Sequence, residues 1–214
     1  MIAIIGGGPA GLAAALAAAD AGAKVVIIES GPRLGGQYWR HLPETDPHRW
    51  RGQENLHHDY VAGQTLRRAI LENSRIEVLL NAAVWRASRI GGGTKLHILV
   101  EGVNRYITSP VLILATGAYD RSLPFPGWDI PGVMTAGGVQ SLLMGNFVLA
   151  GKKVVVAGTG PFLLPVAAGL AENGAEIVAL IDANPIRRWL PKMHIALKNF
   201  SKVREGAHYL ARHD

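Results

Sequence analysis

The feature that most constrains this chain is a glycine-rich segment close to its N-terminus. Residues 6–11 read GGGPAG, which matches the pattern G-x-G-x-x-G. The pattern alone is weak evidence, but it follows a short apolar run at 2–5 and precedes an Ala- and Leu-rich segment at 9–21. A β-branched run at 24–29 comes next. This order predicts a β-turn-α-β unit with two parallel strands.

Each part of this unit suits the binding of a dinucleotide. Gly6 permits the tight turn, Gly8 lets a pyrophosphate approach backbone N–H groups, and Gly11 lets the helix pack closely on the strand. The carboxylate of Glu29, at the end of the second strand, can accept hydrogen bonds from ribose hydroxyls. The alternative is a glycine turn with Glu29 as a solvated acid, but the complete strand–turn–helix–strand context favours the nucleotide site.

Two later segments also carry small residues. Residues 34–37 read LGGQ, a glycine turn in which backbone passes close to another group, and an ordinary loop is the alternative. Residues 113–118 read ILATGA, where a buried strand ends in small residues against which a cofactor can lie. Each is weak evidence alone, and both gain weight from the first motif.

The β-turn-α-β pattern occurs a second time at 153–182. Its loop reads GTG at 158–160, but Leu163 stands where the third small residue belongs. Asp182 ends the next strand and favours NAD over NADP, although the arginine pair at 187–188 could serve a 2′-phosphate. A unit kept for packing, with no bound nucleotide, is the alternative. The candidates for this second site, with NAD(P) or another adenine nucleotide as the ligand, are Gly158, Gly160, Pro161 and Asp182.

These patterns together predict an α/β protein. Residues 1–120 are expected to form a Rossmann-like domain with an antiparallel β-meander at about 83–109. A crossover linker rich in Pro and Gly, followed by a helix around 138–149, is expected within 121–150. Residues 151–214 are expected to form part of a second dinucleotide-binding domain.

Composition excludes several functions. The chain has no cysteine, which rules out a disulfide framework, a zinc–thiolate site and a redox dithiol within it. The net charge is +6, but the basic residues are scattered and their longest run is a pair, so nucleic-acid binding is not expected. The histidines at 41, 48, 57 and 58 lack a metal-ligand spacing, so no metal is expected.

The uncharged stretch at 1–19 has about the length of a membrane span. However, it contains the glycine loop, and no basic residue precedes its apolar part, as a signal peptide would require. We therefore expect neither a membrane span nor a targeting segment, and a cytoplasmic location.

With these motifs the chain resembles a known group of proteins, the flavoproteins with two dinucleotide-binding domains and the glutathione reductase fold. Residues 117–121 (GAYDR), 124–128 (PFPGW) and 131–133 (PGV) are similar to one branch of it. That branch contains the FAD subunits of opine oxidase, of hydrogen cyanide synthase and of dye-linked proline or hydroxyproline dehydrogenases. The resemblance implies bound FAD, with Val84 at the adenine. The FAD-site residues expected from the motifs and the resemblance are Gly6, Gly8, Pro9, Ala10, Gly11, Glu29, Ser30, Gly35, Gly36, Gln37, Val84, Thr116 and Gly117.

The chain also departs from this group. It lacks the cysteine pair of the disulfide reductases, which excludes disulfide reduction by this chain alone. It also lacks the Gly-Asp dipeptide of the late strand that returns to the flavin, so we expect the N-terminal part of a longer protein or one piece of a split one.

The sequence is compatible with three functions. The first is an FAD-dependent oxidoreductase subunit or fragment acting on a small amine or imino-acid substrate, with a partner subunit or self-association. The others are a non-catalytic nucleotide-binding fragment that assembles with a partner chain, and an NAD(P)H-dependent flavin reductase. No side chain stands out as a catalytic acid or base.

Overall fold

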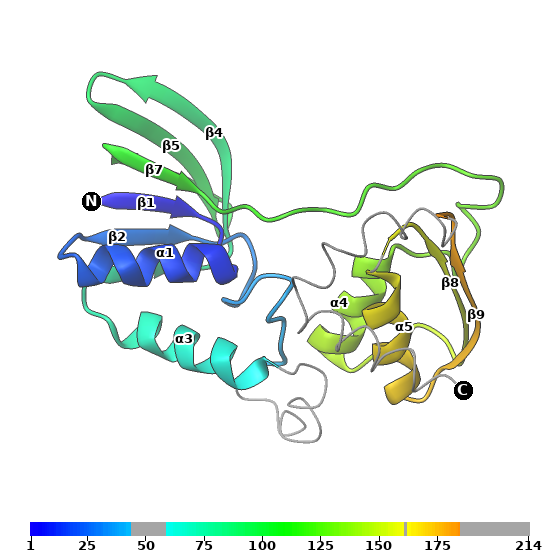
Figure 1. Cartoon of the computed structure of the whole chain (residues 1–214). Coiled ribbons are helices and arrows are strands. Elements are labelled where there is room, and N and C mark those ends of the chain that lie inside the picture. Colours follow the sequence, from blue (N-terminus) through cyan, green and yellow to red (C-terminus); the bar gives the residue numbers. More distant parts are fainter. Residues whose placement is uncertain (44–58, 161, 185–214) are drawn as a thin grey trace. The chain divides into compact units, whose positions relative to one another are not determined.

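The computed structural model describes residues 1–43, 59–160 and 162–184 (Figure 1). The chain divides into two compact units, Met1–Tyr119 and Asp120–Asp214, which are described separately below. The polar segment at 44–58, Pro161 and the tail from 185 onwards lie outside the described residues.

The first unit is built on a parallel sheet of four strands in the order β3-β2-β1-β7. All four residues of β2 are buried, which is the expected pattern for a parallel strand covered on both faces. The central strand β1 pairs with β2 on one side and with β7 on the other. The strands are β1 (Ile2–Ile5), β2 (Val25–Ile28), β3 (Ile76–Leu79) and β7 (Val111–Leu114).

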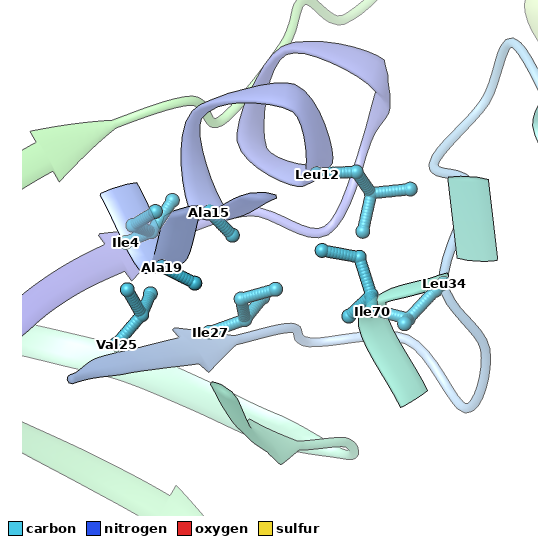
Figure 2. Close-up of a cluster of buried hydrophobic side chains, with 8 residues drawn as sticks. All are labelled: Ile4, Leu12, Ala15, Ala19, Val25, Ile27, Leu34 and Ile70. Atoms are coloured by element: carbon cyan, nitrogen blue, oxygen red, sulfur yellow. The ribbon is translucent and has the colours of Figure 1, made fainter. Parts of the chain in front are cut away.

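Helices α1 (Pro9–Asp20) and α3 (Tyr60–Glu72) cover one face of this sheet (Figure 1). Figure 2 shows their shared core, which includes Leu12 of α1, Ile70 of α3 and Ile27 of β2. The first helix ends at Asp20, close to the end of the Ala- and Leu-rich segment at 9–21, and Gly22 follows it with a left-handed φ of 88°. The uncharged segment 1–19 thus contains a strand, a loop and all but the last residue of a helix of 12 residues.

The other face of the sheet is covered by an antiparallel meander, as predicted. Its strands are β4 (Ala82–Ile90), β5 (Gly93–Val100) and β6 (Val103–Ser109). Leu96 and Ile98 of β5 are fully buried and pack with Val26 and Ile28 of β2. The unit therefore has three layers, helices on sheet on meander.

A buried hydroxyl ties the meander to the start of the sheet. Ser109 is 2% exposed, and its Oγ accepts a hydrogen bond from the N–H of Ala3 at 3.1 Å. The same hydroxyl lies 3.0 Å from the carbonyl oxygen of Met1 and 2.7 Å from that of Val111, and its single proton serves these two acceptors.

We expect Ser109→Ala to lower the free energy of unfolding by about 1–3 kcal/mol, because it removes a buried hydroxyl that hydrogen-bonds the backbone of Ala3, Met1 and Val111. Urea denaturation measures this loss. Ser74→Ala is the control, since Ser74 is exposed and the substitution should change stability by less than about 0.5 kcal/mol. Equal midpoints for the two variants would contradict this assignment.

The second unit contains one β-turn-α-β motif preceded by a helix. Strands β8 (Lys153–Gly158) and β9 (Glu176–Asp182) are parallel neighbours, and α5 (Leu163–Glu172) packs on both. Helix α4 spans Ala136–Asn146, so the predicted helix at 138–149 begins earlier and ends earlier than expected. It ends there because Phe147 adopts a left-handed φ of 53°. No helix in the described ranges is long and apolar enough to cross a membrane.

Candidate functional site

The glycine loop lies between the carboxyl end of β1 and the start of α1, where parallel sheets commonly bind ligands. Gly6 has a φ of 105°, and a Cβ there would overlap the carbonyl oxygen of Ala115, just after β7. A Cβ on Gly11 would in turn overlap the carbonyl oxygen of Gly6. These two glycines therefore serve the close packing of helix, loop and sheet.

Gly8 differs, because nothing inside the protein requires a glycine at this position. Its φ is −78°, which any residue can adopt, and a Cβ there would find only Gly36 Cα, at 3.9 Å. It is also the N-cap residue of α1, and no side chain caps that end of the helix. The space beside a Cβ at Gly8 is therefore open, and the N–H groups of Ala10 and Gly11 in the first helical turn have no side-chain cap, which fits the pyrophosphate of a dinucleotide. Pro9, Ala10 and Gly11 form this first turn.

The carboxylate of Glu29 joins two loops beside this space. Its Oε2 accepts a hydrogen bond from the N–H of Gly7 at 2.6 Å, and its Oε1 accepts one from Gly31 at 2.7 Å. The hydroxyl of Ser30 donates to Oε1 at 3.4 Å. A carboxylate has about four acceptor positions, so with these three bonds in place it can still accept one from a ribose hydroxyl.

The second glycine turn lies directly over the loop. Gly35 donates its N–H to the carbonyl oxygen of Gly7 at 2.8 Å. Gly36, with a φ of 60°, is so close that a Cβ on it would be 2.9 Å from Gly8 Cα. The turn thus forms one wall of the open space above Gly8.

The third motif meets this turn from β7. The side-chain amide of Gln37 donates to the carbonyl oxygen of Ala118 at 3.0 Å. Thr116 and Gly117 immediately precede that residue and are exposed. Three segments that are far apart in the sequence therefore meet around the glycine loop.

Val84 lies on β4, a strand that begins beside Glu29. The N–H of Ala82, at the start of β4, donates to the backbone carbonyl of Glu29 at 2.9 Å. Val84 pairs with Ile98 just before a bulge in the ladder. Its predicted contact with adenine stays a prediction.

The second loop resembles the first in outline but is packed differently. The N–H of Gly160, where φ is 93°, lies 3.4 Å from Oδ1 of Asp182, which also accepts from Asn184 at 2.8 Å. A Cβ on Gly158 would be 3.1 Å from the Leu163 side chain, which fills the place between helix and strand. Pro161 lies outside the described residues.

His41 is buried beside the second glycine turn and is not placed to bind a metal. Its Nδ1 lies 2.7 Å from the carbonyl oxygen of Leu42, and its Nε2 lies 3.2 Å from that of Leu34. Burial, aided by the charge of Arg67, lowers the pKa of His41 below its ordinary value of 6.5. In the described part of the chain, no group of three or more His, Asp or Glu side chains is gathered for a metal ion. The other three histidines of the polar stretch, at 48, 57 and 58, lie outside it.

Several contacts at this site had no signal in the sequence. Gly7 donates to Glu29, and a Cβ on Gly7 would be 2.7 Å from the Leu34 side chain, although the motif allows any residue there. Ala118 contributes only a backbone carbonyl, which the sequence cannot indicate.

A glycine loop at the end of the central strand, an acid at the end of its neighbour and a meander behind the sheet define a class, the FAD- and NAD(P)-dependent oxidoreductases. Comparison with known proteins agrees, because the model of the family described as "Pyridine nucleotide-disulphide oxidoreductase" matches residues 1–201. The chain belongs to this family, whose members bind FAD and NAD(P). The predicted fold class and the predicted resemblance are confirmed.

The similar proteins include several that are named as enzyme subunits. The chain is 35% identical over 184 residues to one subunit of the opine oxidase of Agrobacterium tumefaciens, covering 84% of this chain and 36% of that one. It is 34% identical over 205 residues to the HcnB subunit of the hydrogen cyanide synthase of Pseudomonas protegens, covering 92% and 41%. It is 32% identical over 191 residues to the alpha subunit of the sarcosine oxidase of Corynebacterium, covering 84% and 19%.

Among solved structures, L-proline dehydrogenase from P. horikoshii matches with a TM-score of 0.70 and 25% identity, over 83% of this chain and 34% of that one. The chain thus spans less than half the length of each of these four proteins.

Proposed function

We propose that this chain forms the FAD site of an oxidoreductase that removes a hydride from the carbon next to an amine or imine nitrogen. The observation that carries the FAD site is the open space over Gly8 at an uncapped helix N-terminus. When bound there, the isoalloxazine of FAD would supply the redox chemistry, and the protein would bind, orient and tune it.

In this proposal each segment has a separate task. The N–H groups of the first turn of α1 bind the pyrophosphate, and Glu29 accepts from the ribose of the adenosine half. Gly36 and Gln37 close the wall over the loop, while Thr116 and Gly117 offer small residues at the end of β7. Val84 is assigned to the adenine. We assign no acid or base to the described residues.

The amine class of substrate is supported by the similar proteins. Two of them are named for sarcosine and L-proline, and both of these compounds are amino acids with a secondary amine. Several are also named as subunits, which supports a partner subunit for this chain. The alternative of a non-catalytic nucleotide-binding fragment makes the opposite prediction, that no amine reduces the flavin.

A second candidate function is reduction of the flavin by NAD(P)H. Asp182 beside the N–H of Gly160 favours it, because an acid at this place suits a ribose with a free 2′-hydroxyl. Leu163 is evidence against this function. Its buried side chain occupies the place where, in a complete motif, a third small residue lets helix and strand approach.

Anaerobic mixing separates these functions. We expect the FAD-loaded chain, with its partner subunit if one is found, to lose the oxidised flavin band with a secondary amine such as L-proline or sarcosine. NADH should not bleach the band within seconds, because the Leu163 side chain occupies the place where a third small residue would let helix and strand approach.

Rapid bleaching by NADH but not by amines would replace the first function with the second. If the chain binds no FAD at all, the non-catalytic nucleotide-binding fragment would be the remaining candidate function. The Glu29→Ala variant, loaded under the same conditions, is the control for flavin bound at the proposed site.

A further inference from the structure

The glycine turn over the first site is attached to helix α3 as well as to the glycine loop. We call residues 35–39 the strap; its first three residues contact the loop and Ala118, as described above. The next two contact α3. The Tyr38 hydroxyl donates to Oδ2 of Asp59 at 2.8 Å, and the Trp39 indole lies on Gly63, where a Cβ would be 2.6 Å from Trp39 Cγ.

The two anchors on α3 lie on one face of the helix. Asp59 is its N-cap residue and Gly63 follows one turn later, with the N–H of Gly63 donating to the carbonyl of Asp59 at 3.1 Å. The strap is also closed internally, because Trp39 donates its N–H to the carbonyl of Gly35 at 3.1 Å. Trp39 packs against the buried core as well. The strap is therefore held on the cofactor side by its first residues and on α3 by its last two.

A glycine at position 63 is costly to the helix itself. Glycine inside a helix is less favourable than alanine by about 1 kcal/mol, and Gly63 has no left-handed φ that would require it. The nearest atoms to a Cβ at this position are all in the indole of Trp39, at 2.6 to 2.8 Å. The absence of a side chain at Gly63 thus leaves the surface of α3 on which the indole ring packs, which we call the seat of the ring. Gly169 in α5 is a contrast, because a Cβ there would meet no atom within 4 Å.

We propose that Gly63 and Trp39 are positioning residues for the FAD site. The seat of the indole on α3 fixes how closely the strap lies over Gly8, and through it the wall of the pyrophosphate site. This inference rests on the proposed FAD site, but the position of the strap can also be measured without the cofactor. Neither residue touches the open space itself in this assignment; both act through the strap.

The test compares Gly63→Ala with the matched helix variant Gly169→Ala. In the chain without FAD, we expect Gly63→Ala to speed amide hydrogen exchange in the peptide covering the strap by at least tenfold, because the added methyl displaces the indole. FAD titration of the same variant should show an affinity at least tenfold weaker. Gly169→Ala should change neither quantity, and melting followed by circular dichroism should show that both variants fold.

A second variant separates positioning from general damage. Trp39→Leu removes the ring, so adding Gly63→Ala to it should cause no further loss of strap protection or of FAD affinity. Wild-type exchange and affinity in Gly63→Ala, or additive effects in the double variant, would overturn the inference. Absence of FAD binding by the wild-type chain would overturn the proposed function instead, while the exchange measurement would still decide the coupling of α3 to the strap.

Discussion

Gly8→Val is expected to abolish FAD binding and to leave the fold intact. The backbone at this position suits any residue, and a Cβ there would contact only Gly36 Cα, at 3.9 Å, which is an ordinary van der Waals distance. It would stand in the space that we assign to the pyrophosphate. FAD titration should show no saturable binding, while the thermal midpoint should stay close to that of the wild type.

Two variants make this expectation specific. Gly11→Ala should instead lower stability strongly, because its Cβ overlaps the carbonyl oxygen of Gly6. Glu29→Ala should weaken FAD binding by tenfold or more, since it removes a charged acceptor, with each charge-assisted hydrogen bond contributing roughly 1.5–3 kcal/mol. Unchanged FAD affinity in both Gly8→Val and Glu29→Ala would refute the site.

The second large effect concerns the β8–β9 pair, which we expect to cause association of the 214-residue chain studied alone. Parallel strands are normally covered on both faces, yet Val155, Val178 and Ile181 are each more than half exposed. We therefore expect light scattering to show dimers or larger species, which carry well below one FAD per chain.

Charge on these strands should reverse the association. The double variant Val155→Lys with Val178→Lys should run mainly as a monomer, because lysines on exposed strands oppose pairing. Leu71→Lys is the control, since Leu71 is an equally exposed apolar residue on α3 but is not part of these strands. A wild-type chain that stays monomeric with one tightly held FAD would show that this expectation is wrong.

The sequence predicted the parts of the site that depend on backbone chemistry. Gly6 and Gly11 are needed for close packing whatever the ligand, and their spacing from the first strand is visible in the letters alone. The apolar runs of β1 and β2 likewise predicted two parallel strands, since continuous apolar residues are typical of strands that are buried on both faces.

The contacts that sequence could not predict are those between distant segments. Gln37 and Ala118 are 81 positions apart, and the acceptor is a backbone carbonyl that every residue has. No motif in the sequence marks Gly63, and its partner Trp39 is identified only when α3 and the strap are placed together. The sequence did not predict the end of α4. The helix ends where Phe147 adopts a left-handed backbone conformation, and the residue type phenylalanine does not indicate that conformation.

The position of β7 next to β1 determines when, during synthesis of the chain, the parallel sheet can be completed. β7 lies next to β1, with Ile2 opposite Val111, so the whole meander is synthesised before the central strand gains its second neighbour. Pairing of strands so far apart closes a long loop, which slows folding. The carbonyl of Ala115 under Gly6 arrives with this last strand. A nascent chain that ends before β7 should therefore be unable to hold the cofactor, and capture of FAD should begin only after that strand has left the ribosome.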